Sequence, residues 1–189
     1  MSAKFINLKD IVAALCVTVM ISGPLPAQTA DLQDESELLE RLSEADPAEA
    51  SRLDRQLQAL WGKSGSAAMD LLLKRGRDAL EVDNVEEAIE HLTALTDHAP
   101  DFAEGWHMRA SAYFEAELFG PALADLERAL SLNPNNYNAI YGLGAILETF
   151  GEDALAYDAY TRVLAIHPHH EEVTKATVRL ETRIQGNSL

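Results

Sequence analysis

The chain has 189 residues, a formal net charge of −16 and a single cysteine. This acidic balance argues against nucleic acid and anionic membrane surfaces as partners, because both are bound through neutralisation of phosphate charge. About 160 residues remain after the N-terminal segment described next, which is enough for one domain with a continuous core. A lone cysteine forms no intrachain disulfide, so the stability of the domain must come from packing.

Residues 1–30 have the layout of a secretory signal peptide. Two lysines precede an apolar run over residues 11–21, and a Gly-Pro pair and a further proline follow before the alanines at 27 and 30. The run is far shorter than the roughly 20 residues that span a bilayer. We therefore expect cleavage after Ala27 or Ala30, loss of Cys16 and a periplasmic location in a bacterium. The alternative is an N-terminal anchor in the inner membrane that leaves the chain facing the periplasm.

Residues 31–66 are predicted to form an N-terminal helical cap and a linker. Leucines spaced along two segments give each segment one apolar stripe, as expected for a pair of amphipathic helices. Asp46 followed by Pro47 is a helix start signal. Since this pair does not share the repeat pattern described next, we expect it to cover the exposed face of the first repeat. Gly62–Ser66 is predicted to be a turn, because it lacks the leading glycine and the strand of a phosphate-binding loop.

One pattern returns three times at a spacing of 34 residues, over 69–102, 103–136 and 137–170. Position 8 of the copies is always small, and so is position 20. Positions 4, 11 and 24 are almost always large and apolar. The small residues at position 8 are Gly76, Ala110 and Gly144, and a proline stands near the end of each copy at 100, 134 and 168. Such a unit is expected to be a hairpin of two closely approaching helices, and the hairpins are expected to stack.

The pattern resembles that of the tetratricopeptide repeat family. The middle copy matches the family signature best, through Trp106, Ala110, Tyr113, Ala122, Leu126, Ala129 and Pro134. Arg75 and Arg109 depart from it, since they replace the usual leucine at position 7. The resemblance implies an all-α, right-handed superhelical stack of three hairpins, flanked by the N-terminal helix pair and by a C-terminal capping helix over 171–189. We expect that last helix to bury Val173, Ala176, Leu180 and Ile184 against the third copy.

Local signals place the ends of the repeat helices. Asn84 with Glu87, and Asp101 with Glu104, are each read as an N-cap followed three residues later by a glutamate. Gly120-Pro121 and Gly151 are predicted to form the turns inside the second and third copies.

The resemblance implies that the first helix of each copy lines a concave groove that binds a protein or peptide. The candidate groove residues are Leu73, Arg77, His107, Ser111, Phe114, Tyr141, Glu148, Lys175, Arg179 and Arg183. In the competing interpretation Leu73 and Phe114 pack inside the protein. Likewise the three cations of the last helix, predicted to receive carboxylates of a partner, could instead belong to a solvated face.

The residues by which one class of the family holds the C-terminal carboxylate of cytosolic chaperones are absent. At those positions stand Leu73, Arg77, Met108, Asn138 and Gly142. This absence agrees with an exported protein.

No catalytic motif and no cofactor motif is present. The patch from His167 to Glu172 leaves a metal-binding or enzymatic role as a remote alternative. We therefore predict a non-catalytic adaptor of the periplasm that binds a protein or peptide. The second interpretation is a holding chaperone or assembly helper for exported proteins, for example in cytochrome maturation.

Overall fold

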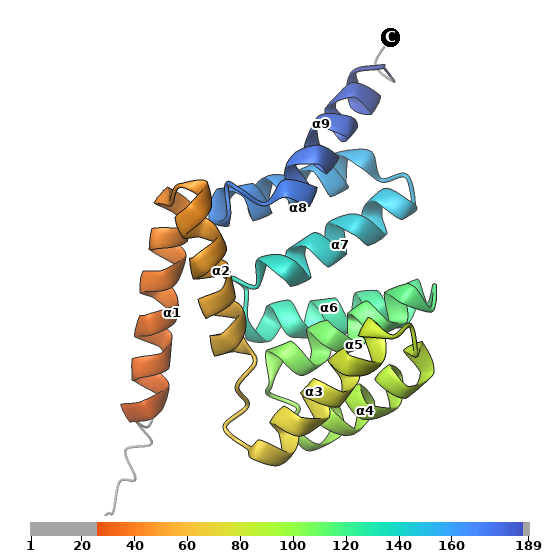
Figure 1. Ribbon diagram of the computed structural model, residues 1–189. Coiled ribbons are helices and arrows are strands. Elements are labelled where there is room, and N and C mark those ends of the chain that lie inside the picture. Colours follow the sequence, from red (N-terminus) through yellow and green to blue (C-terminus); the bar gives the residue numbers. More distant parts are fainter. Residues whose placement is uncertain (1–25, 187–189) are drawn as a thin grey trace, which may run out of the picture.

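The computed structural model describes residues 26–186, with side chains over residues 34–185. In this part of the chain every regular element is a helix. The nine helices are α1 Pro26–Glu44, α2 Pro47–Trp61, α3 Ala67–Glu81, α4 Val85–His98, α5 Ala103–Glu115, α6 Phe119–Leu132, α7 Tyr137–Thr149, α8 Asp153–Ile166 and α9 Glu171–Gly186. The pairs α3/α4, α5/α6 and α7/α8 are the three predicted hairpins, and Figure 1 shows them stacked from bottom to top. The predicted all-α stack with a helix pair before it and one helix after it is confirmed.

Close approach inside the hairpins depends on the small residue at position 8. A Cβ atom added at Gly76 would lie 2.5 Å from Cγ of Leu92, and one at Gly144 would lie 2.5 Å from Cε1 of Tyr160. Both distances are below any normal van der Waals contact. The large residues at position 24 therefore press directly on the backbone of the first helix, as the repeat pattern predicts.

The turns inside the hairpins share one backbone conformation. Asp83, Glu117 and Gly151, which are 34 residues apart, have φ angles of 57°, 58° and 76°. Gly151 therefore lies in a turn as predicted. The prediction for the second copy was wrong, because Gly120 and Pro121 lie in the first turn of α6 and the tight turn comes before them. The left-handed conformation is carried there by Glu117, a residue that gives no glycine signal.

Two of the three predicted helix starts are confirmed. The Asp46 side chain accepts hydrogen bonds from the backbone N–H groups of Ala48 and Glu49, and that of Asn84 accepts one from Glu87. The third was wrong. Phe102 occupies the N-cap of α5 without a side-chain hydrogen bond, and Asp101 instead pairs with Arg128. The glutamate assigned to that capping box is used elsewhere, as described below.

The N-terminal helix pair does not cover the first repeat. One hydrophobic cluster joins Leu42, Leu53, Leu57 and Trp61 to residues of α7, α8 and α9, whereas the cluster of the first repeat contains no residue of α1 or α2. The ring centroids of Trp61 and Tyr137 lie 5.2 Å apart. The prediction that this helix pair covers the first repeat was therefore wrong, because α1 and α2 pack against the third repeat.

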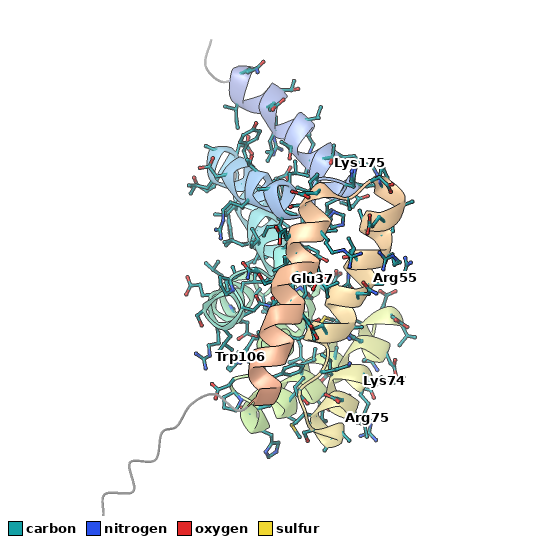
Figure 2. All side chains as sticks on the ribbon, turned by 90° about the vertical axis from the view of Figure 1, so that its left-hand side faces the viewer. Glu37, Arg55, Lys74, Arg75, Trp106 and Lys175 are labelled. Carbon is teal, nitrogen blue, oxygen red and sulfur yellow. The ribbon has the colours of Figure 1, made fainter. Side chains whose placement is uncertain are left out.

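Polar contacts fix the same docking. Tyr137 donates to Asp54, Asn133 donates to Glu35, and His169 lies within hydrogen-bond distance of the carbonyl oxygen of Ala45. In Figure 1 the pair stands beside the stack and across the direction of its helices. Figure 2 shows it from that side, with Glu37 on α1 and Arg55 on α2.

At the other end, α9 packs on α8 as predicted. Val173, Ala176 and Leu180 are buried, and Ile184 is partly buried against the same cluster. The predicted signal segment falls mainly on residues 1–25, which lie outside the described residues. Ala27 and Ala30, the predicted cleavage points, lie in the first turns of α1. No helix among residues 26–186 has the length and apolar character needed to cross a membrane.

Candidate functional site

Four of the predicted groove residues share a pocket on the concave side, between α5 and α7. It is a pocket of about 500 Å³, within the range of small-ligand and side-chain pockets. The pocket is lined by Gln58, His107, Ala110, Ser111, Phe114, Glu115, Leu126, Asn138, Tyr141, Gly142, Ala145 and Ile146. The structure thus brings together His107, Ser111, Phe114 and Tyr141, as the repeat register predicts.

The floor of the pocket is hollow because its residues are small. Ala110 of α5 and Gly142 and Ala145 of α7 line the pocket, and residues this small occupy little of the space between the two helices. Phe114 and Tyr141 provide aromatic walls. Aromatic walls beside a few polar groups are typical of sites that hold apolar side chains of another chain.

Among the lining residues that were not predicted, three are polar: Gln58, Asn138 and Glu115. Gln58 comes from α2, and nothing in the sequence shows that this helix reaches the groove. Asn138 stands at position 2 of the third copy, so the same positional rule that gave Tyr141 could have found it. Glu115 is at position 13 of the second copy, one residue after Phe114, and was not considered.

An aromatic ladder continues from the pocket to the edge of the stack. The ring of Phe119 lies 5.5 Å from that of Phe114 and 5.6 Å from that of Phe150. Phe150 is 63% exposed and Leu118 beside this ladder is 47% exposed. The pocket is therefore open toward an apolar rim at the turns of the second and third repeats.

Arg77, a predicted groove cation, is held by the protein's own carboxylate. Its guanidinium pairs with Glu104, whose side chain is only 7% exposed. His107 and Asn136 also contact Glu104, at 3.2 and 3.3 Å. Burial acts to raise the pKa of Glu104, but the charges and hydrogen bonds of His107 and Arg77 outweigh it, and the net pKa is lowered. Glu104 is therefore a buried anion that joins the first repeat, through Arg77, to the N-cap residue of α7, Asn136.

Breaking a fully buried ion pair from one side costs about 3–5 kcal/mol. The cost of losing Arg77 is smaller, because its side chain is 36% exposed and Glu104 keeps His107 and Asn136. A carboxylate of another molecule would therefore have to compete with Glu104 for Arg77.

The cations of α9 are paired in the same way. Glu148 accepts hydrogen bonds from Arg179 at 2.9 and 3.0 Å and from Arg183 at 2.8 Å, and Arg183 also bonds Asp153. The hydrogen bond from Arg179 is the main reason why the pKa of Glu148 is lowered. Lys175 pairs within its own helix with Glu171 and Glu172. The predicted row of cations thus exists, but each of the three cations forms an ion pair with a carboxylate of the same chain.

Leu73 is not a groove residue. It is 2% exposed and belongs to the core of the first repeat with Leu92 and Leu95. The competing interpretation given for this position, that it packs inside the protein, is the one the structure supports.

The histidines after the third repeat lie at its junction with the N-terminal pair. The ring of His167 is 5.4 Å from that of Tyr137, and the ring of His170 is 5.5 Å from that of Tyr141. Nδ1 of His167 is buried without a hydrogen-bond partner. Burial lowers the pKa of both imidazoles. Among the described residues no group of three or more histidine, cysteine or acidic side chains is arranged to hold a metal ion.

These features define a class of protein: a stack of helical hairpins with a pocket on its concave side. The family model for the tetratricopeptide repeat matches residues 73–120 and 107–171. The chain belongs to the tetratricopeptide repeat family.

Relatives with this repeat come from distant organisms. The chain is 31% identical to a TPR repeat-containing protein of Rhizobium etli over 144 residues, which cover 76% of this chain and 71% of that protein. It is also 31% identical to the human SGT1 homolog over 99 residues, covering 47% of this chain but only 27% of the human protein.

Among solved structures, the first TPR domain of Spaghetti (RPAP3) bound to the HSP90 peptide SRMEEVD has a TM-score of 0.61 and 27% identity. The alignment covers 64% of this chain and 95% of that one. MamA protein is similar over a longer part, 79% of this chain and 80% of that chain, with a TM-score of 0.55. At 22% identity this second similarity concerns the fold alone.

Proposed function

We propose that the protein is a non-catalytic adaptor that binds a segment of another protein in the pocket between α5 and α7. The observation that carries this proposal is the pocket itself, which is preformed, walled by Phe114 and Tyr141, and edged by the amide groups of Gln58 and Asn138. Aromatic anchors give binding energy at low entropic cost, and amides can bond the backbone of a bound segment. The structure of the Spaghetti domain with a peptide supports this use of the fold.

We further propose that the protein acts in the bacterial periplasm, after removal of residues 1–30. The support is the charge and apolar pattern of that segment. Mass spectrometry of the protein recovered from fractionated cells tests this proposal. A mature form that begins at Gln28 or Asp31 in the periplasmic fraction is the expected result, and a full-length form in the cytoplasm would contradict it.

The binding proposal is tested by blocking the pocket without unfolding the protein. Ser111→Leu places an apolar side chain into the pocket at a helical position where the serine hydroxyl bonds only the carbonyl of His107. Ser131→Leu is the matched control, because Ser131 makes the same kind of bond, to the carbonyl of Arg128, on the exposed surface of α6.

Tagged full-length wild type and both variants are expressed in the native cells and purified with their bound proteins. We expect one stoichiometric partner with wild type and Ser131→Leu, and its loss with Ser111→Leu. Many unrelated unfolded chains in place of one partner would favour the holding chaperone. A partner retained by Ser111→Leu would refute binding in this pocket.

A further inference from the structure

The lining of the pocket has only one kind of formal charge. Of its twelve residues, Glu115 alone is an acid, and none is a lysine or arginine. Glu115 is exposed, and among the residues that the structure describes none forms an ion pair with it. An unpaired carboxylate in the lining of the pocket favours a positive charge on the occupant.

The neighbouring cations do not offset this charge. Arg77 is bound by Glu104, while Arg179 and Arg183 are bound by Glu148. An acidic occupant that drew these cations away would strand buried or half-buried carboxylates next to its own negative charge. Arg55 projects from α2 as Figure 2 shows, but it is not among the lining residues of the pocket.

We propose that the occupant is a short segment with bulky apolar side chains and an adjacent lysine or arginine, held with the apolar groups against Phe114 and Tyr141 and the cation at Glu115. The proposal rests on the proposed function and adds the chemistry of the partner. The net charge of −16 acts in the same direction at long range, since it accelerates the encounter with a cationic partner and slows that with an anionic one.

This specificity is the opposite of what the peptide in the Spaghetti structure represents. That peptide, SRMEEVD, ends in an acidic sequence. In the present chain the groove cations that could meet such an end are already neutralised by carboxylates of the protein itself.

The test uses the full chain purified from its host and three labelled peptides with one common apolar core. The core is flanked by lysines in the first peptide, by serines in the second and by glutamates in the third. Fluorescence anisotropy gives Kd for each peptide at low and at physiological salt. The variants are Glu115→Lys in the pocket and Glu127→Lys on the exposed face of α6 as the matched change of charge, with Arg55→Glu as a third.

We expect the lysine-flanked peptide to bind tightest and Glu115→Lys to weaken it on the order of fivefold to tenfold, an effect that shrinks as salt rises. Glu127→Lys should leave the preference for lysine flanks intact. Tighter binding of the glutamate-flanked peptide, lost with Arg55→Glu, would overturn the proposed chemistry but keep a binding pocket. An equal Kd for all three peptides would also overturn it. If Ser111→Leu leaves every Kd unchanged, the binding is elsewhere and the proposed function itself fails.

Discussion

The ion pair inside the second hairpin gives the sharpest test of how this stack is held together. Arg109 replaces the leucine expected at position 7 and bonds Asp125 of α6 through two parallel contacts of 2.6 and 2.9 Å. The two side chains are only 12% and 7% exposed. Asp125→Ala would leave the guanidinium buried without its anion. Breaking a buried pair from one side costs about 3–5 kcal/mol.

The lower end of this range applies here. Arg109 keeps a hydrogen bond of 2.7 Å to the hydroxyl of Thr96, and its guanidinium lies 4.9 Å from the ring centre of Trp106. We therefore expect Asp125→Ala to lower the free energy of unfolding by about 3 kcal/mol. For a chain of this size that corresponds to a fall of roughly 6–12 °C in Tm. Urea unfolding followed by far-UV circular dichroism measures the loss.

A double variant distinguishes the loss of one partner of the ion pair from the loss of the whole pair. Arg109→Leu/Asp125→Ala restores the apolar residue of the family pattern and removes both charges, so its stability is expected within about 1 kcal/mol of wild type. The control is Asp78→Ala, which breaks the exposed pair with Lys74 and should leave Tm almost unchanged. If Asp125→Ala costs under about 1 kcal/mol, or if the double variant is less stable than the single one, the pair is not a buried unit as argued.

Three further expectations concern glycine contacts, turns and pH. Gly144→Ala should cost about 1–3 kcal/mol in urea unfolding, because the new methyl group would overlap the ring of Tyr160, whereas Gly120→Ala meets no atom within 4 Å and should cost nothing. Glu117→Gly should raise stability by about 0.5–1 kcal/mol by relieving the positive φ; a loss of stability would contradict this. Burial lowers the pKa of His167 below 6.5 in the folded protein, so the unfolded chain binds more protons and the free energy of unfolding should fall as the pH drops below 6.5. His167→Phe should reduce this dependence of Tm on pH in thermal melts at several pH values. An unchanged dependence would show that it does not come from His167.

The repeat register could be predicted from the sequence because small residues recur at fixed positions of the repeat. Gly76 and Gly144 recur at the one position where a helix presses on its partner, and any larger side chain there would collide with Leu92 or Tyr160. Such a constraint is local to one hairpin and returns in each copy. The pocket follows from it, because the same register fixes which residues of α5 and α7 face each other.

Contacts between segments far apart in the sequence were not predictable in this way. The leucine stripe of α2 shows which face is buried but carries no information on what buries it, so the pair was assigned to the wrong repeat. Glu104 follows Asp101 at the spacing of a capping box, and this local pattern hid its role as the buried partner of Arg77. In the same way, the partner of Arg109 lies 16 residues away on another helix.

The docking of the N-terminal pair on the third repeat can be decided by one double-mutant cycle. The rings of Trp61 and Tyr137 are in contact at 5.2 Å, so replacing both by leucine should show a coupling energy of about 0.5–1.5 kcal/mol in urea unfolding. Tyr113 lies in the second repeat beside Arg109, and the cycle of Trp61→Leu with Tyr113→Leu should be additive. If the pair covered the first repeat instead, Trp61 would couple to neither tyrosine, and Gln58 would no longer form a wall of the pocket. A coupling energy near zero for Trp61 and Tyr137 would therefore contradict the docking of α1 and α2 on the third repeat and the contribution of Gln58 to the pocket.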